Sequence, residues 1–389
     1  MNRRRRAFVA ALLSSPSTFV RAWAGEDDAT RRVLHVGPHR AIKRIRDVVR
    51  QVRDGDIVEI DAGDYVGDVA VWRQSNLVIR GVAGLSRLVA AGHSAEGKAI
   101  FVVRGDAVTI ENLTFSGARV PSRNGAGIRH ETGRLRVRDC IFVGNEEGLL
   151  TGNDADAELA IEGCEFGHNG AGDGQTHDLY VGSIAKLFVT ESYFHHANVG
   201  HLFKSRALES FVFYNRLTDE AGGRASYELE FPSGGGAYVI GNIIGQSATT
   251  RNPIVVRYGA EAYRAQGNEL FLVNNTLVND RRGDAFALVV RPGAQRIKAF
   301  DNLFVDLAPI HGLAIESAAN LRVGREDFAD IARFDCRLHR SSDAMGRAVL
   351  PGRANGHDLR PSREYVHPRQ SRPIDARIYS PGAIQTISS

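Results

Sequence analysis

The sequence predicts an all-β fold, a single-stranded right-handed parallel β-helix that winds through about nine to eleven coils. Three observations support this prediction: a recurring eight-residue pattern, short alternating strands between its copies, and abundant glycine. Glycine supplies 41 of the 389 residues, which suits many short strands joined by tight turns. Because a solenoid stacks one repeat on the next, its outer surface consists of continuous parallel sheets.

The eight-residue pattern has alternating apolar residues, then a polar or glycine turn residue, then a second short strand. Its copies read VTIENLTF, LRVRDCIF, LAIEGCEF, LFVTESYF, FVFYNRLT, YVIGNIIG, FLVNNTLV and KAFDNLFV, spaced 24 to 33 residues apart. The predicted turn residues are Asn112, Asp139, Gly163, Glu191, Asn215, Asn242, Asn275 and Asn302. Asparagine tolerates the left-handed conformation, and its amide can hydrogen-bond the coils above and below. Leucine-rich repeats and β-sandwiches are disfavoured, because the recurrent leucine framework and the hairpin turns are missing.

Residues 1–24 have the pattern of a cleavable export signal, with a basic start, a modest apolar stretch and Ala22-Trp23-Ala24 before Gly25. Arg5 to Val9 also resemble the twin-arginine export motif, so the export route stays open. We therefore expect a periplasmic or secreted protein. The formal net charge is +4, and Arg3 to Arg6 alone supply four positive charges. The rest of the chain is therefore near neutral, which disfavours a nucleic-acid partner. No apolar run predicts a membrane span, and we expect a monomer.

Residues 25–317 are predicted to form the solenoid, with a capping helix at about 40–53 whose apolar residues recur at helical spacing. A Gly55-Asp56 turn and an alternating strand at 57–60 follow this helix. Residues 318–389 show little periodicity. We expect them to form an irregular C-terminal segment that covers the far end and packs on the solenoid flank.

The helix, the Gly-Asp turn, the strand and Gly63-Asp64-Tyr65 together resemble the N-terminal end of the pectin lyase-like right-handed parallel β-helix superfamily. GHLFKSRA and SYELEFPSGGG also resemble exported bacterial proteins described only as right-handed parallel β-helix repeat proteins. The architectural resemblance spans about residues 33–317. It implies a carbohydrate-active protein and leaves the class open, because the superfamily includes polysaccharide lyases, hydrolases, methylesterases, uronate epimerases and non-catalytic modules.

A second strand lies between successive copies of the pattern, at 148–152, 178–182, 201–206, 226–231, 253–259, 287–293 and 312–317. Aligning these strands predicts a core column of Leu149, Leu179, Leu202, Ile254, Leu288 and Leu313. Alternation then predicts an outer face formed by Asp178, Tyr180, His201, Phe203, Ser205, Ser226, Glu228, Glu230, Arg257 and Arg291. Adjacent coils lie about 4.8 Å apart, so these side chains should form one surface.

This outer face is the predicted functional site, and β-elimination in a uronic-acid polymer is the favoured reaction. Such a lyase neutralises the uronate carboxylate, removes the C5 proton and protonates the leaving oxygen. The predicted catalytic residues are Lys204 and Arg206, as carboxylate neutralisers or as a base of tuned pKa, and His201 and Tyr180, as acid and base. The predicted substrate-binding residues are Asp178, Phe203, Ser205, Glu228, Glu230 and Arg257. Alternation places Lys204 in the core, so we expect either a bulge that turns it outward or an acidic partner.

Two other functions stay open. A glycoside hydrolase would use Asp178, Glu228 and Glu230, although the predicted outer column lacks the aspartate pair of polygalacturonase-type enzymes. The same three acids leave calcium open as a cofactor, and no other metal ligands are assigned. A non-catalytic polysaccharide-binding or assembly module would rely on stacking by Tyr180, Phe203 and Tyr258.

Two residue pairs outside this face complete the predictions. His195 and His196 are expected to be solvated turn residues. Cys140 and Cys164 occupy the same register on successive coils, which fits either a disulfide or a stack of two thiols.

Overall fold

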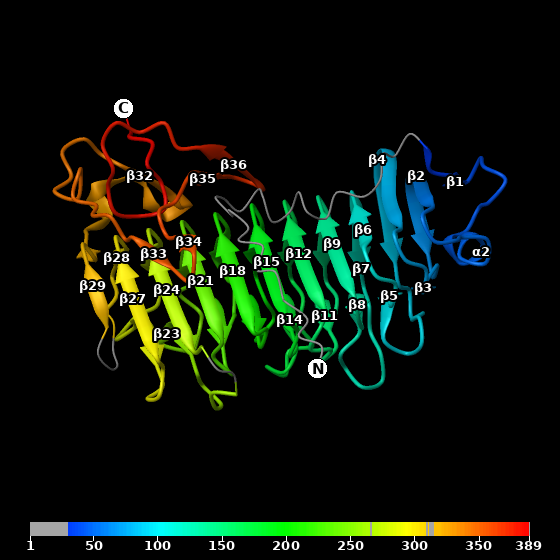
Figure 1. The fold of residues 1–389 in the computed structure, drawn as a ribbon, viewed down its shortest axis with the longest axis horizontal. Coiled ribbons are helices and arrows are strands. Elements are labelled where there is room, and N and C mark those ends of the chain that lie inside the picture. Colours follow the sequence, from blue (N-terminus) through cyan, green and yellow to red (C-terminus); the bar gives the residue numbers. More distant parts are fainter. Residues whose placement is uncertain (1–29, 265–266, 309, 311–314, 389) are drawn as a thin grey trace, which may run out of the picture.

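The computed structural model is a right-handed parallel β-helix, and it describes residues 30–264, 267–308, 310 and 315–388. Figure 1 shows the strands stacked side by side along the long axis, from the blue N-terminal end to the orange C-terminal region. The strands form three parallel columns, because corresponding segments of successive repeats pair with each other. One column is a separate nine-stranded sheet, and the other two belong to a 21-stranded sheet. The predicted fold class is confirmed.

The strands follow in the same order in most coils. The first column contains β1 (Val33–Val36), β2 (Ile57–Val66), β4 (Val78–Val89), β6 (Val108–Glu111), β9 (Arg134–Arg138), β12 (Glu158–Glu162), β15 (Lys186–Thr190), β18 (Glu209–Phe213), β21 (Gly236–Ile240), β24 (Glu269–Val273), β27 (Arg296–Phe300) and β29 (Glu316–Ala318). The second contains β7 (Leu113–Ser116), β10 (Ile141–Val143), β13 (Glu165–Gly167), β16 (Tyr193–His195), β19 (Arg216–Thr218), β22 (Ile243–Gln246), β25 (Thr276–Asn279), β28 (Leu303–Val305) and β30 (Leu321–Arg322). The nine-stranded sheet contains β3 (Ala70–Trp72), β5 (Ala99–Val103), β8 (Ala126–His130), β11 (Glu147–Thr151), β14 (Leu179–Val181), β17 (Phe203–Ser205), β20 (Leu229–Phe231), β23 (Ile254–Tyr258) and β26 (Phe286–Val290).

A stack of phenylalanines runs through the interior of the solenoid. Phe115, Phe142, Phe166 and Phe194 occupy successive strands of the second column, with neighbouring ring centroids 4.6 to 5.2 Å apart. All four rings are fully buried. Each of these coils therefore places a phenylalanine on the phenylalanine of the coil before it, which gives the coils their common register.

One residue per coil adopts the left-handed conformation at the turn between the first two columns. Asn112, Asp139, Gly163 and Glu191 hold it as predicted, with φ of 53°, 51°, 59° and 57°. In later coils the prediction is wrong by one residue, because the left-handed residues are Tyr214, Gly241, Asn274 and Asp301. The asparagine that follows each of these is buried.

These buried asparagines form a ladder of amide hydrogen bonds between coils. Asn215 Nδ2 donates to Asn242 Oδ1, Asn242 Nδ2 to Asn275 Oδ1 and Asn275 Nδ2 to Asn302 Oδ1, each at 3.0 Å. Each Nδ2 also donates to a backbone carbonyl, as Asn242 does to Val212 at 2.9 Å. The predicted bonding of amides between coils is therefore confirmed.

The core column of the nine-stranded sheet departs from the prediction after two coils. Leu149 pairs with Leu179 as expected, but Leu179 pairs with Phe203. Leu202 is also buried, in the turn before β17, so two consecutive apolar side chains enter the core. The column continues through Leu229, Val256 and Leu288. Ile254 lies two residues before this column, and the predicted Leu313 lies outside the described residues.

The N-terminal helix is shorter than predicted and consists of α2 (Ile45–Val48), whose Ile45 and Val48 are buried. The Asp68 carboxylate begins this helix by accepting from the backbone nitrogens of Ile45 and Arg46, at 2.6 and 3.0 Å. The predicted export signal lies outside the described residues. Among those that are described, no helix has the length and apolarity needed to cross a bilayer.

The C-terminal segment contains short elements and packs on the 21-stranded sheet (Figure 1). Its elements are η2 (Arg325–Asp327), β31 (Phe328–Asp330), η3 (Ile331–Arg333), β32 (Asp335–Leu338), β33 (Arg353–Ala354), β34 (His357–Asp358), β35 (Arg363–Val366) and β36 (Gln370–Pro373). The last six strands form three antiparallel pairs. Cys140 and Cys164 are buried free thiols rather than a disulfide.

Candidate functional site

The outer face of the nine-stranded sheet carries Tyr180, Lys204, Glu230 and Arg257 in one column across β14, β17, β20 and β23. Lys204 points outward because Phe203, not Leu202, takes the core position of β17. No bulge is needed, since the shifted register reverses the face of every later residue in the strand. Lys204 also has an acidic partner, with Nζ 3.6 Å from Glu230 Oε2.

Tyr180 contacts two cations from the next coil. Arg206 Nη1 donates to the Tyr180 hydroxyl oxygen at 2.6 Å. The Arg206 Cζ and Lys204 Nζ atoms lie 5.1 and 5.8 Å from the centre of the tyrosine ring. Arg206 is held by Glu261, whose Oε2 lies 3.2 Å from Nε. The phenol and both cations therefore form one cluster on the outer face.

His201 lies beneath this cluster with both ring nitrogens engaged. Its Nε2 lies 2.8 Å from Glu230 Oε2, and its Nδ1 lies 2.9 Å from Ser226 Oγ. Burial lowers the pKa of His201, although Glu230 opposes this effect. Burial would by itself raise the pKa of Glu230, but the hydrogen bond from His201 and the charge of Lys204 lower it. The pair therefore consists of a mostly neutral imidazole and a carboxylate at neutral pH.

Two residues that the sequence prediction missed extend the site toward the preceding coils. The His177 backbone nitrogen donates to Glu147 Oε2 at 2.9 Å, and the His201 backbone nitrogen donates to His177 Nδ1 at 3.0 Å. Burial raises the pKa of Glu147 and lowers that of His177. Glu147 was excluded because the predicted strand began at residue 148, one residue too late. Its acidic type just before that strand was the available signal.

Four residues predicted to face outward lie instead in the interior, because Asp178, Phe203, Ser205 and Glu228 are fully buried. Phe203 and Ser205 flank Lys204 in β17, so they point to the opposite face. Asp178 Oδ1 accepts from Asn169 Nδ2 at 2.7 Å, and burial raises the pKa of both Asp178 and Glu228. The prediction of three acids on one face is therefore wrong, and only Glu230 of this set lies beside the cluster. Because the three acids do not share one face, the predicted hydrolase residues and the predicted calcium ligands lose their basis.

The remaining predicted residues lie at the edges of the face. Ser226 contacts His201, and Arg257 is the coil neighbour of Glu230. Arg291 is exposed and donates to the Ala260 carbonyl at 3.5 Å. Tyr258, proposed for substrate stacking, is fully buried, as is Phe203. Of the three stacking aromatics, Tyr180 alone lies on the outer face.

A second group of polar side chains, His168, His195 and His196, lies where the second column ends. His195 is the last residue of β16 and is 9% exposed, so the prediction that it is a solvated turn residue is wrong. The strand extends to this residue because it pairs with Gly167 of the preceding coil. These three residues are called the histidine trio below.

The fold is similar to that of a solved polysaccharide lyase. A crystal structure of the pectate lyase Pel9A superposes with a TM-score of 0.60 and 12% identity, covering 92% of this chain and 97% of that one. A structure of a PL6 alginate lyase in complex with a trisaccharide matches with a TM-score of 0.26 and 11% identity, covering 78% and 86%. No family model and no curated protein matches the chain. The chain has the pectin lyase-like parallel β-helix fold.

Proposed function

We propose that this protein is an exported polysaccharide lyase that cleaves a uronic-acid-containing polymer by β-elimination on the outer face of the nine-stranded sheet. One observation carries the proposal: the Tyr180 hydroxyl accepts from Arg206 at 2.6 Å, and Lys204 lies over the same ring. A proton-transfer group is thereby held beside two fixed cations. β-Elimination from a uronate requires this combination of a base and a stabiliser of the carboxylate charge.

In the proposed reaction, the substrate carboxylate binds Lys204 and Arg206, which makes the adjacent C5 proton more acidic. The phenolate form of Tyr180 takes that proton, and the electron pair of the C5–H bond forms the C4–C5 double bond. The C4–O bond breaks, and the Tyr180 hydroxyl supplies a proton to the leaving glycosidic oxygen. The Arg206 guanidinium supports this cycle because it stabilises negative charge on the phenol oxygen.

His201 has a positioning role in this proposal. Its two nitrogens are engaged by Glu230 and Ser226, and only 6% of the residue is exposed. A substrate therefore reaches Tyr180 and Lys204 more readily than His201. The imidazole fixes the Glu230 carboxylate, which in turn fixes the Lys204 ammonium.

The test is incubation of the full chain with polygalacturonate, alginate and a neutral glucan, followed by ultraviolet absorbance of the unsaturated uronate product. We expect Tyr180→Phe to lower kcat/KM by about 10²–10⁴-fold. Lys204→Ala should lower it by about 10²–10³-fold. Lys298→Ala is the matched control, because Lys298 forms a similar pair with Glu316, 2.9 Å away, on the other sheet.

Three results would reject the proposal. Reducing ends that appear without the unsaturated product would indicate hydrolysis. Binding of an acidic polymer without any product would indicate a non-catalytic module. Elimination that survives in Tyr180→Phe would assign the proton transfer to another residue.

A further inference from the structure

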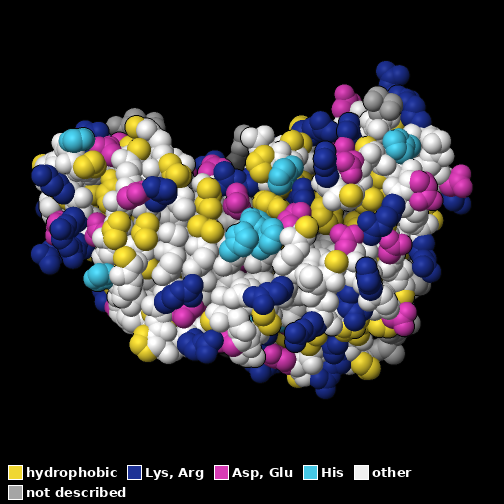
Figure 2. All heavy atoms as spheres, turned by 180° about the vertical axis from the view of Figure 1, so that it is seen from behind, with side chains coloured by type: hydrophobic (Ala, Val, Ile, Leu, Met, Phe, Trp, Pro, Cys, Tyr) yellow, Lys and Arg dark blue, Asp and Glu magenta, His cyan; other side chains and the backbone are white. Residues whose placement is uncertain are grey.

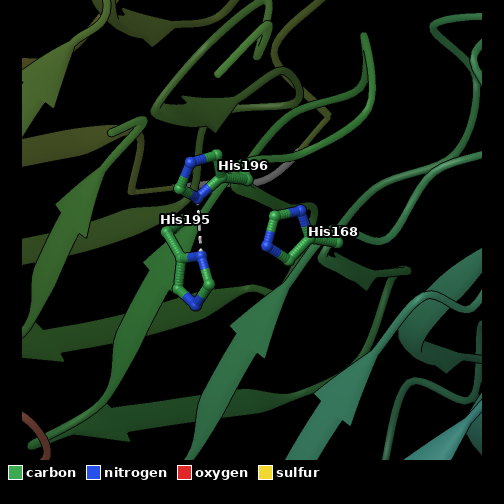
Figure 3. A group of neighbouring side chains, drawn as sticks. All are labelled: His168, His195 and His196. Carbon is green, nitrogen blue, oxygen red and sulfur yellow. Dashed lines mark hydrogen bonds between the residues drawn. The ribbon is translucent and has the colours of Figure 1, made fainter. Parts of the chain in front are cut away.

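The histidine trio brings three imidazoles from two successive coils to one place (Figure 3). One nitrogen from each ring lies within 4.8 Å of the others. The Nδ1 atoms of His195 and His196 are 2.8 Å apart, and the rings of His168 and His196 stack with centroids 4.6 Å apart. Figure 2 shows histidine side chains gathered at the surface near the middle of one face. His168 is exposed and His196 is half-buried, so an ion from solvent has access to the trio.

The local backbone explains this convergence. Gly167 pairs with His195, and His168 and His196 follow them at equivalent positions on their coils. His168 and His196 both adopt the left-handed conformation, with φ of 57° and 53°, which is uncommon for residues other than glycine. A Cβ added to Gly167 would lie 2.3 Å from His195 Cε1, so the imidazole occupies space that only glycine leaves open.

Two of the three rings also contact groups outside the trio. His195 Nε2 lies 3.4 Å from Glu165 Oε1, and His196 hydrogen-bonds the backbone of Ala221. A carboxylate and a backbone carbonyl are the usual outer partners of metal-ligating histidines, because they fix the ring and the tautomer. The His195 and His196 Nδ1 atoms, which face each other, share at most one proton between them.

We propose that His168, His195 and His196 form a site for one Zn²⁺ ion, bound through three imidazole nitrogens with a fourth position open to solvent. Imidazole favours zinc and similar transition metals, whereas calcium requires oxygen ligands. Three histidines with an open position are a common zinc ligand set. Zn–N bonds of about 2.0–2.1 Å place tetrahedral ligand nitrogens about 3.3 Å apart, so the two Nδ1 atoms separate by only about 0.5 Å on binding.

The zinc site shares no residue with the outer-face cluster of Tyr180, Lys204 and Arg206, so it goes beyond the proposed lyase activity.

The experiment uses the full chain without a polyhistidine tag, freed of metal by a chelator and then dialysed. Calorimetric titration with Zn²⁺ should show one ion per chain, and Co²⁺ should give the visible bands of nitrogen coordination. His168→Ala removes a ligand and should weaken Zn²⁺ binding by about 100-fold or more. Glu165→Gln removes the outer partner of His195 and should weaken it by about 10–100-fold.

Two further variants separate a built site from scattered histidines. Gly167→Ala keeps all three ligands but displaces the His195 ring, and it should also weaken binding. His39→Ala removes an exposed histidine from another part of the chain and should bind Zn²⁺ like the wild type. Circular dichroism without metal checks that each variant is folded.

The proposal fails if the wild-type chain does not bind one equivalent of Zn²⁺. It also fails if folded His168→Ala binds as tightly as His39→Ala. Unchanged affinity in folded Gly167→Ala would exclude His195 as a ligand and overturn the three-histidine site.

Discussion

His201 and Glu230 lie on neighbouring coils and are joined by a 2.8 Å contact between Nε2 and Oε2, with both residues almost fully buried. The same carboxylate oxygen lies 3.6 Å from Lys204 Nζ. The Glu230 carboxylate therefore contacts both the buried His201 imidazole and the Lys204 ammonium on the outer face. This shared oxygen links the interior edge of the site to the residues that we expect to contact the substrate.

Glu230→Gln should lower the pKa of His201 further, because burial already disfavours the imidazolium and Glu230 is its main counterion. The measurement is an NMR titration of the histidine ring protons. We also expect a loss of kcat/KM of about 100-fold, from misplacement of Lys204. Glu165→Gln is the control, since Glu165 contacts His195 instead. A His201 titration unchanged in Glu230→Gln would contradict the assigned contact.

Asp219→Asn should change how stability depends on pH. Burial raises the pKa of Asp219 from 3.8 to about 7. Between these values the folded chain binds more protons than the unfolded chain, so this group makes wild-type stability fall as pH rises, by up to about 1.4 kcal/mol per pH unit. Urea unfolding at several pH values should show this loss in the wild type relative to Asp219→Asn. Parallel profiles for the two proteins would rule out the raised pKa.

Glu228→Leu should stabilise the protein at neutral pH. Glu228 is fully buried, its oxygens make no hydrogen bond of normal geometry among the described residues, and burial raises its pKa. We expect the free energy of unfolding to rise by about 1–3 kcal/mol. Glu209→Leu, on the surface of β18 beside Lys186, should change it by less than about 0.5 kcal/mol. Destabilisation by Glu228→Leu would mean that the carboxyl group has a structural partner.

Asn242→Ala should destabilise the solenoid. The Asn242 amide donates to Val212 and Asn275, and its Oδ1 accepts from the backbone nitrogen and Nδ2 of Asn215, so its loss removes hydrogen bonds from buried groups in both neighbouring coils. Each such group costs about 1–3 kcal/mol. Denaturant unfolding followed by circular dichroism is the measurement. A loss below about 0.5 kcal/mol would show that the ladder adds little to stability.

The repeat predicted the fold because every coil contributes one copy of the pattern, so the period is visible in the sequence alone. Register was harder to predict, since alternation cannot distinguish one buried residue from two in succession. Leu202 and Phe203 are both buried, and this pair displaced the predicted faces of Phe203, Ser205 and Lys204. Tyr180 was predicted correctly to lie on the outer face, but its contact with Arg206 depends on the pairing of β14 with β17.

The histidine trio was beyond sequence reasoning for a different reason. His195 and His196 are adjacent in the chain, but His168 comes from the coil before, and Gly167 provides the space for the His195 ring. A glycine in one repeat has no visible connection to a histidine in the next until the two strands are aligned. Burial of His195 is therefore a property of the pair, not of either residue.

The C-terminal segment gives the solenoid a property that stacked repeats lack by themselves. It contacts successive coils in turn: Ser371 bonds Glu191, the Ser362 nitrogen donates to the Tyr214 hydroxyl at 3.0 Å, Asn355 donates to the Tyr238 hydroxyl at 3.0 Å, and the Ala383 nitrogen donates to Thr276 at 3.0 Å. A solenoid held by nearest-neighbour contacts alone can fray one coil at a time. Here a coil that opens also loses its contacts with the C-terminal segment, which neighbouring coils share. These coils should therefore unfold as one cooperative unit.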